Sequence, residues 1–346
     1  MQPRRLPSTT GLFRVLLLTA CATTAVFVLS ETRARRLGYE PNHPWLPGMW
    51  THQRFQLETL PDDHTVLLGA SRIQFGIHLD TWETRTGMRP LILAWPGAPF
   101  GPMLTDLAQN TNFRGTAICN IAPSFVFAAE ATPRVAAARL MVTGLESQRI
   151  SAAYQVGQPM RILLQENLCM LNPPAFSPIE ALRQALRLPN RERTRIPVVI
   201  PPAWYTDREL QLRFTPQLYE SADMRNQLIT LYRSITSLQK SFGPCNIERW
   251  LEQARADVQA IEKRGGRVIF LRIPSSGYFL QFERDEYPRT QYWDRVLQET
   301  GCTGIHFEDY DNLTHYTCPE ESHMSATDAI EYTGRVLDIL QGQHAP

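Results

Sequence analysis

Three side chains from opposite ends of the chain could together perform nucleophilic acyl chemistry. Ser71 directly follows the apolar start of "LLGASRIQFG" (67–76), and "CPEESHMSATDAIEYTG" (318–334) holds His323 with Glu320 three residues before it. A serine hydroxyl is a poor nucleophile unless a base lies within hydrogen-bond reach, and that base needs a carboxylate to fix its tautomer. Ser71 as nucleophile, His323 as base and Glu320 as acid would meet both requirements.

The same residues also have simpler interpretations. Ser71 lacks the G-x-S-x-G context of a nucleophile elbow, because position 73 is Ile. A serine at the end of a strand is commonly the N-cap of the following helix. His323 can equally be a polar residue in the loop before the last helix. Taken alone, neither residue decides between a structural and a catalytic role.

Two further positions could contact a substrate. Gly97 lies in "AWPGAPFG" (94–101), after an apolar run. A glycine lets a backbone N–H approach a ligand closely, as an oxyanion hole requires. Arg72 could bind an anionic or hydroxyl-rich substrate, or simply pair with a neighbouring acid. We expect both near the site of Ser71.

Residue types that bind metals are also clustered near the C-terminus, at His306, Glu308, Asp309, Asp311 and His315. Strand alternation would send positions 306 and 309 to opposite faces, and no H-E-x-x-H or paired C-x-x-C motif accompanies them. The sequence therefore predicts no metal and no cofactor.

Short apolar runs bounded by Gly, Pro or charged residues predict the strands that must position these residues. They are "HTVLLGA" (64–70), "LILAWPG" (91–97), "GTAICNI" (115–121), "RVIFLRI" (267–273) and "TGIHFED" (303–309). Helical patterns over 103–111, 246–266, 291–301 and 326–342 alternate with them. This alternation predicts a parallel sheet in a three-layer α/β/α sandwich, whose ligands sit at the carboxyl ends of the strands.

The stretch from about 125 to 245 interrupts this alternation with helical segments and the arginine-rich "PNRERTR". We expect a mostly helical insertion that caps the sheet. Its segment "RIPVVIPPAWYTDRE" (195–209) is expected to bring aromatic and charged side chains back toward the site. A cap that only buries the sheet edge is the alternative.

The N-terminal segment "GLFRVLLLTACATTAVFVLS" (11–30) is apolar apart from Arg14. A membrane-spanning helix needs about 20 such residues, so we expect an uncleaved single-pass anchor. The apolar run is long for a cleaved signal peptide, and it continues beyond Cys21, where a lipoprotein signal would end. Both alternatives remain open at this stage.

These observations divide the chain into an anchor over 1–36, a linker over 37–60 and a folded domain over 61–346. Within the second part, "PNHPWLPGMW" (41–50) has three prolines and two tryptophans. It fits a stiff linker with rings at the lipid headgroups, or a proline-rich surface loop.

Composition excludes some classes of function. The 346 residues include 35 basic and 34 acidic side chains, for a formal net charge of +1. Without a basic block after residue 36, the chain has no field to attract nucleic acid, and no such partner is expected. Six cysteines are too few for a disulfide scaffold, although a bridge between Cys302 and Cys318 would suit an oxidising periplasm.

Together, "VLLGASR", "AWPGAP" and "PEESHMSATDA" resemble motifs of the SGNH/GDSL hydrolase superfamily. The resemblance is to the membrane-anchored branch that includes the alginate O-acetyltransferases and the D-alanyl transfer proteins of cell walls. It covers roughly 60–130 and 265–340 and leaves the insertion uncovered. It implies a flavodoxin-like sheet, with Ser71 attacking an ester carbonyl and His323 as base. The backbone N–H groups of Ser71 and Gly97 would stabilise the oxyanion.

The chain departs from the family pattern at two places. The family acid is usually aspartate, whereas this chain has Glu320, whose extra methylene requires a shifted backbone or a different hydrogen bond. The G-x-N-D block that supplies an asparagine oxyanion donor is replaced by "CNIAPSF". Asn120 is the only amide there and the candidate donor, although the pattern places it inside a strand. Loss of one donor costs about 100- to 1,000-fold in rate unless the insertion supplies another.

The leading hypothesis is acyl transfer, with acetyl as the expected group, or ester hydrolysis on an extracellular or cell-wall polysaccharide. The enzyme would be anchored in the inner membrane and face the periplasm, with a membrane-bound acyltransferase or polysaccharide synthase as a further partner. The second hypothesis is a non-catalytic member of the superfamily that binds polysaccharide or scaffolds a synthesis or export complex. A lipid-directed esterase is a third, less supported by the polar "PNRERTR".

Overall fold

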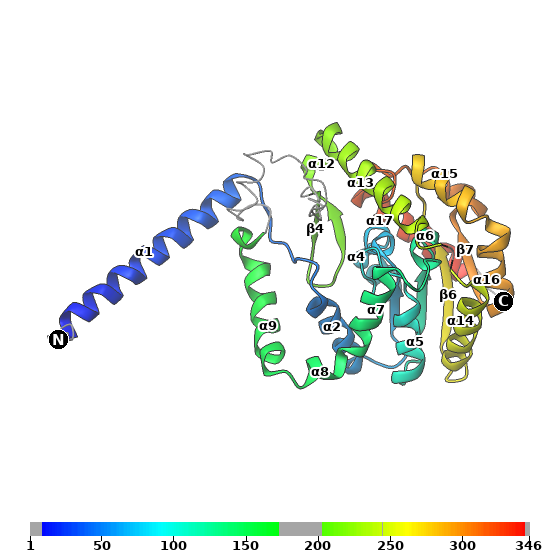
Figure 1. Cartoon of the computed structure of the whole chain (residues 1–346), viewed down its shortest axis with the longest axis horizontal. Helices are drawn as coiled ribbons and strands as arrows, with labels where there is room; N and C mark the ends of the chain where they lie inside the picture. Colours follow the sequence, from blue (N-terminus) through cyan, green and yellow to red (C-terminus); the bar gives the residue numbers. More distant parts are fainter. Residues whose placement is uncertain (1–8, 173–202, 244, 343–346) are drawn as a thin grey trace.

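The five apolar runs form one parallel sheet in the computed structural model, which describes residues 9–172, 203–243 and 245–342. All five predicted strands are confirmed, each within the bounds of its run. They are β1 (Thr65–Leu68), β2 (Leu91–Ile92), β3 (Thr116–Asn120), β6 (Arg267–Arg272) and β7 (Thr303–His306). Figure 1 shows the sheet inside the domain.

The order of the strands across the sheet is β2-β1-β3-β6-β7. In register, Val66 of β1 pairs with Leu91 on one side and with Ala117 on the other. The chain therefore leaves β1 and β3 in different directions, and a doubly wound sheet opens a crevice at that point, beyond the carboxyl ends of the strands. Ser71 follows β1 directly, so the topology places it at this edge.

Two groups of helices account for the regular connections between the strands. In one group α17 packs on α3 and α4, and in the other α14 packs on α5 and α16. The predicted helices at 103–111, 246–266, 291–301 and 326–342 are confirmed with small shifts at their ends. The bounds are α3 (Ser71–Gly76), α4 (Leu79–Thr86), α5 (Gly101–Asn110), α14 (Ile247–Glu262), α15 (Gly277–Glu286), α16 (Trp293–Thr300) and α17 (Ala326–Gly342). Nearly every residue of β3 and β6 is buried, as in a sheet covered on both faces.

The described part of the insertion is mostly helical, as predicted, but it also contains an antiparallel hairpin that the sequence did not predict. Its middle, including "PNRERTR" and the start of the 195–209 segment, lies outside the described residues. The elements are α6 (Pro123–Val126), α7 (Pro133–Thr143), α8 (Leu145–Arg149), α9 (Ala152–Asn167), β4 (Trp204–Thr206), β5 (Leu212–Phe214), α12 (Pro216–Glu220) and α13 (Ala222–Lys240).

The N-terminal helix α1 (Thr9–Arg36) projects from the domain (Figure 1). Within the described residues it is the one helix long and apolar enough to cross a membrane. The length and the apolar composition of α1 agree with the predicted anchor.

The prediction of a linker over 37–60 is wrong for its second half. Pro47 begins the helix α2 (Pro47–Gln56), and Met49 and Trp50 are fully buried in the core. The Trp50 indole N–H donates to the Leu93 carbonyl at 2.9 Å. A proline is well suited to the first turn of a helix, so Pro47 and the residues after it belong to the domain. Short 3₁₀ turns complete the fold at η1 (Leu57–Thr59), η2 (Cys169–Leu171), η3 (Arg289–Gln291), η4 (Phe307–Asp309) and η5 (Asp311–Leu313).

Candidate active site

Ser71, His323 and Glu320 form a continuous chain of hydrogen bonds, which we call the triad. Ser71 Oγ lies 2.7 Å from His323 Nε2, and His323 Nδ1 lies 2.5 Å from Glu320 Oε1. The second carboxylate oxygen of Glu320 accepts from the Ser322 backbone N–H at 2.9 Å. The fold thus brings together residues 252 positions apart in the sequence.

The position of Ser71 decides between its two interpretations. Ser71 is the first residue of α3, Ala70 is the N-cap, and no side chain caps this helix. The hydroxyl of Ser71 is directed to His323 instead. The alternative in which Ser71 serves as a helix cap is therefore wrong.

All three side chains of the triad are buried. Exposure is 8% for Ser71, 6% for His323 and 0% for Glu320. A carboxylate withdrawn from water needs hydrogen-bond donors on its oxygens, and here the His323 ring and the Ser322 N–H occupy one oxygen each. The arrangement matches the geometry in which an acid orients a base and the base contacts a nucleophile.

The loop that carries Glu320 and His323 is fixed to the N-terminal end of α15. Glu321 between them has a positive φ of 73°. Its carboxylate accepts from the Tyr278 backbone N–H at 3.0 Å, and its carbonyl accepts from the Ser276 N–H at 2.9 Å. These contacts hold the acid and the base of the triad at a defined spacing.

Aromatic rings surround His323. Ring centroids lie 4.5 Å away for Phe75, 6.4 Å for Phe214 and 6.1 Å for Tyr232. Phe214 ends β5 and Tyr232 lies on α13, so the insertion covers the site. Burial, and then the nearby charge of Glu320, raise the pKa of the Tyr232 phenol well above its ordinary value, which keeps this side chain neutral.

The aromatic residues expected from segment 195–209 are not the ones at the site. Within the described part of that segment, Trp204 stacks on Trp45 with centroids 5.1 Å apart. The Tyr205 hydroxyl donates to the Gly38 carbonyl. Phe214 and Tyr232 take the expected place, and no sequence motif distinguishes them from other aromatic residues of the insertion.

Gly97 adopts a left-handed conformation with φ of 68°. Its carbonyl accepts from Nη1 of Arg134 at 3.0 Å, and a Cβ on Gly97 would lie 1.6 Å from that nitrogen. Only glycine fits beneath the guanidinium here. The predicted need for glycine is explained by this close approach, while its role as an oxyanion donor stays a prediction.

Arg134 is a residue that sequence reasoning missed. It comes from α7 of the insertion, and its guanidinium stacks over the Phe125 ring at 5.3 Å. Phe125 belongs to the same buried cluster as Ala70, the neighbour of Ser71. Burial lowers the pKa of Arg134, and in the described part of the chain no carboxylate pairs with it. A half-buried cation without a carboxylate partner, held on the Gly97 turn, is a candidate for substrate or transition-state contact.

Arg72 does not bind substrate in the way the sequence suggested. Its side chain is 1% exposed and pairs with Glu283 of α15 at 2.9 Å. Arg272 pairs with the same carboxylate at 2.5 Å. Burial by itself would raise the pKa of Glu283, but the two guanidinium groups outweigh it and hold the pKa below its ordinary value. The alternative of pairing with a neighbouring acid is confirmed.

Asn120 has a structural role in this fold. It is the last residue of β3 and fully buried, and its amide Nδ2 donates to the Leu271 carbonyl of β6 at 3.0 Å. Its Cβ also packs closely against Gly69. The structure therefore assigns Asn120 to bridging two strands, which corrects its assignment as an oxyanion donor.

The cluster of metal-type residues near the C-terminus is dispersed by the fold. Among the described residues, no group of three or more His, Cys, Asp or Glu side chains could hold a metal ion. His306 packs between Trp293 and Phe307. Burial, followed by the charge of Arg272, lowers the pKa of His306 to about 3.

The suggested bridge between Cys302 and Cys318 is also absent, since both thiols are free.

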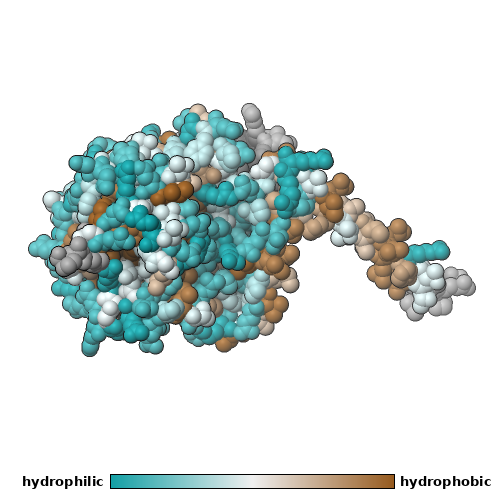
Figure 2. All heavy atoms as spheres, turned by 180° about the vertical axis from the view of Figure 1, so that it is seen from behind, coloured by the Kyte–Doolittle hydropathy of each residue, from teal (hydrophilic) through white to brown (hydrophobic). Residues whose placement is uncertain are grey.

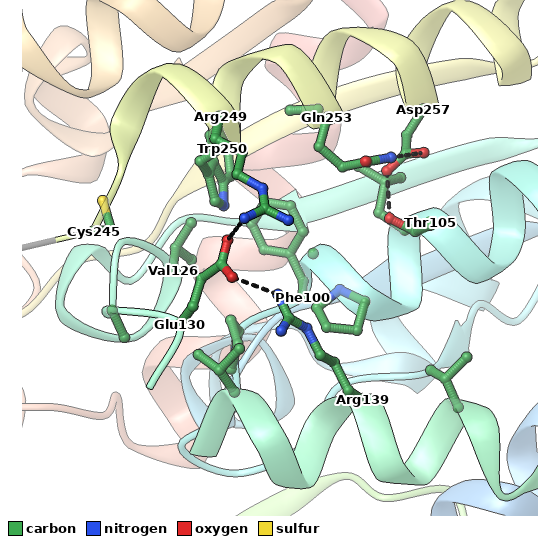
Figure 3. Close-up of a pocket in the computed structure, with 18 of the residues that line it drawn as sticks. Phe100, Thr105, Val126, Glu130, Arg139, Cys245, Arg249, Trp250, Gln253 and Asp257 are labelled. Atoms are coloured by element: carbon green, nitrogen blue, oxygen red, sulfur yellow. Dashed lines mark hydrogen bonds and ion pairs between the residues drawn. The ribbon is translucent and has the colours of Figure 1, made fainter. Parts of the chain in front are cut away.

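A cavity of about 380 Å³ lies between α5, α7 and α14 (Figure 3). At one end the Glu130 carboxylate pairs with Arg139 and Arg249, each at 3.5 Å. At the other end Asp257 accepts from the Thr105 hydroxyl at 2.6 Å. No member of the triad lines this cavity. Glu130 is neutralised by its two arginines, and Asp257 also accepts from the Gln253 amide. It is therefore separate from the candidate active site.

The fold and the site define an α/β protein with a five-stranded parallel sheet and a buried Ser-His-Glu triad at the carboxyl edge of that sheet. No protein-family model, curated protein or solved structure matches the chain. Its function must be argued from the site itself.

Proposed function

We propose that the chain is a serine-dependent O-acyltransferase or esterase that acts on acetyl esters of an extracellular or cell-wall polysaccharide. The observation that carries the proposal is the triad, in which the nucleophile, base and acid are already within hydrogen-bond distance. A structural role would not require a buried serine, histidine and glutamate in that order of contact.

The proposed reaction begins when Ser71 Oγ attacks the acyl carbonyl carbon and His323 Nε2 takes the hydroxyl proton. Glu320 stabilises the imidazolium that forms. The tetrahedral intermediate then collapses, the C–O bond to the leaving alcohol breaks, and His323 returns the proton to that alcohol. Water or a sugar hydroxyl attacks the acyl-Ser71 ester in the same way. Transfer and hydrolysis differ only in this last nucleophile.

The oxyanion requires donors besides the triad. The backbone N–H of Ser71 at the start of α3 is one proposed donor, and the N–H of Gly97 is the second. Arg134 binds the Gly97 carbonyl and keeps that turn in place. This contribution from the insertion compensates for Asn120, whose amide is used between the strands.

A small acyl group suits the site. Phe75, Phe214 and Tyr232 crowd His323, and Ser71 is only 8% exposed. A long acyl chain would have to displace these rings, whereas an acetyl group would not. This crowding favours acetyl esters over lipid substrates.

The polysaccharide substrate and the location follow from the family resemblance and from α1. As a membrane anchor, α1 would hold the domain at the periplasmic face of the inner membrane. There it would meet a membrane-bound acyltransferase or a polysaccharide synthase. No cofactor takes part in the proposed chemistry.

A fluorophosphonate probe and an acetyl-ester assay on the full-length chain test this function. The wild-type protein should label at Ser71 and hydrolyse 4-nitrophenyl acetate, and Ser71→Ala should do neither. Ser322→Ala is the matched control, since it removes a neighbouring buried serine hydroxyl but keeps the backbone N–H that binds Glu320. Equal turnover by Ser71→Ala and wild type would end the nucleophile assignment.

The second candidate function is a non-catalytic polysaccharide-binding or scaffold subunit. It is favoured by one observation, the engagement of Asn120 between strands, because the family's amide oxyanion donor is then missing. Under this alternative, neither wild type nor Ser71→Ala would react with the probe.

A further inference from the structure

The helix α9 has large apolar side chains on its exposed face. Val156, Met160, Leu163 and Leu164 are 72%, 53%, 56% and 41% exposed, respectively. Their spacing of four, three and one residues places them on one face of the helix. We call these four residues the α9 stripe.

The opposite face of α9, which packs on the domain, is partly polar. Its buried residues are Gln158, Ile162 and Gln165. The Gln158 amide contacts the sulfur of Met49 at 3.1 Å, and Gln165 is 8% exposed on the same face. A surface helix in water has the reverse pattern, with apolar residues inside and polar residues outside. The reversed pattern is typical of a helix whose apolar face contacts something less polar than water.

The C-terminal end of α9 is tied to the end of α1. The Arg35 guanidinium donates to the Asn167 carbonyl at 2.9 Å. The Glu31 carboxylate accepts from the backbone N–H groups of Cys169 and Met170 at 3.1 and 2.9 Å. Figure 1 shows α1 and α9 meeting at this point and then diverging, with α9 on the side of the domain next to α1. One end of the stripe thus lies where α1 would leave a membrane.

We propose that the α9 stripe lies in the interfacial layer of the bilayer that α1 spans, so that the domain rests on the membrane. Figure 2 shows apolar side chains on the part of the domain beside the base of α1. Arg161 is exposed next to Met160, where a long cationic side chain can reach lipid headgroups. The proposal depends on the insertion of α1 and not on the acyl chemistry.

A bilayer fits the stripe better than a protein partner. The stripe is four side chains long and one helix wide, whereas a stable protein interface buries about 800 Å² on each partner. An interfacial helix needs only one apolar face that enters the headgroup and acyl boundary by about 5–10 Å. The C-terminal end of α9 is also hydrogen-bonded to α1, the one described helix that can cross a membrane. Lipid around α1 would therefore lie close to the stripe.

Photo-crosslinking of the full-length chain tests the proposal. The photoreactive residue p-benzoylphenylalanine replaces Met160 in the stripe, in vesicles of phosphatidylethanolamine and phosphatidylglycerol and in the membranes of the producing cells. Leu238 on α13, which is 60% exposed, is the matched control outside the stripe. Leu16 in α1, also 60% exposed, is the control for insertion of the anchor. Adducts are identified by mass spectrometry.

The expected result is a lipid adduct at positions 160 and 16 and none at 238. Adding Val156→Gln and Leu163→Gln should abolish the adduct at 160 without lowering the melting temperature, because both side chains are exposed. A lipid adduct at 16 alone, or equal adducts at 160 and 238, would overturn the proposal. So would a protein adduct at 160, which would identify a partner or a second copy as the occupant. Absence of lipid adducts at both 16 and 160 would overturn it as well, since α1 would then lie outside the bilayer.

Discussion

Substitution of Glu320 by Gln tests the triad at its acid. Each oxygen of the Glu320 carboxylate accepts one hydrogen bond, from His323 at 2.5 Å and from the Ser322 N–H at 2.9 Å. A glutamine of the same length has one acceptor oxygen and one donor NH₂. If the oxygen stays on the Ser322 N–H, the NH₂ meets His323 Nδ1. That contact favours the tautomer with the proton on Nε2, which then cannot accept the proton of Ser71.

The expected loss of activity differs between two variants of Glu320. Loss of the tautomer-fixing carboxylate in Ser-His-Asp enzymes costs about 10⁴-fold in kcat, and we expect a loss of this order for Glu320→Gln. In Glu320→Asp the carboxylate is withdrawn by about one C–C bond, or about 1.5 Å. The 2.5 Å contact to His323 then lengthens to as much as about 4 Å, beyond hydrogen-bond reach. A charge-assisted bond worth about 1.5–3 kcal/mol is lost, which is about a ten- to hundredfold decrease in rate.

The assay is the hydrolysis of 4-nitrophenyl acetate by the purified full-length chain, with the rate of fluorophosphonate labelling as a second readout. Glu331→Gln is the matched control, since Glu331 is a half-exposed carboxylate on α17 and its loss should leave both rates unchanged. The expected order of activity is wild type, then Glu320→Asp, then Glu320→Gln. A folded Glu320→Gln protein with the wild-type kcat would refute the assignment of Glu320 as the acid.

Three further predictions concern the surroundings of the triad. Arg134→Ala should lower kcat by about 100-fold with little change in KM if the guanidinium holds the oxyanion turn at Gly97. Arg139→Ala on the same helix is the control, and a change in KM alone would contradict the positioning role. Phe214→Ala should raise turnover of butyryl esters relative to acetyl esters by about tenfold or more, because it opens space beside His323; unchanged selectivity in esterase assays would argue against acyl crowding. His306 has an ordinary pKa of 6.5 and a folded pKa of about 3, so the unfolded chain binds its proton first as the pH falls, and stability is lost from about pH 6.5 toward pH 3. The loss at pH 5 is about 2 kcal/mol, and His306→Asn should remove that part of the pH dependence in denaturant titrations; identical slopes for the two proteins would contradict it.

The strands and the triad could be predicted because their signals are local. A short apolar run bounded by Gly, Pro or charged residues marks a buried strand, and all five such runs are strands of the sheet. Ser71 follows the first run directly, and residues that follow parallel strands collect at one edge of the sheet. Its pairing with His323 could be predicted because a serine nucleophile needs a base and an acid, and because the three motifs resemble those of the SGNH/GDSL superfamily. The structure confirms this pairing at 2.7 Å.

The partners of Arg72 could not be predicted, because they depend on contacts between distant elements. Arg72 is the neighbour of Ser71 in α3, and in a helix adjacent residues point in different directions. Ser71 faces His323, while Arg72 points into the interior, where Glu283 comes from an element 211 positions away. A charged residue next to a nucleophile carries no sequence signal that distinguishes substrate contact from a buried ion pair.

The prediction of a linker is wrong at α2 for a different reason. Three prolines in ten residues suggested a linker, yet Pro47 is the first residue of α2, where its missing N–H costs nothing. Met49 and Trp50 then face the core. The prolines of this segment mark the residues before α2 and its first turn. The burial of Met49 and Trp50 makes the helix part of the folded domain.

The use of a glutamate as the acid of the triad has a physical explanation in the loop that carries it. A longer acid needs its backbone farther from His323, and the chain between them must turn back within two residues. Glu321 provides that turn through its positive φ of 73°, a conformation that is uncommon for a residue with a side chain and persists only where the surroundings enforce it. The Tyr278 and Ser276 N–H groups supply the restraint by binding the carboxylate and carbonyl of Glu321. The length of the Glu320 side chain and the left-handed conformation of Glu321 thus act together, and Glu320→Asp alone should not place a carboxylate within hydrogen-bond reach of His323.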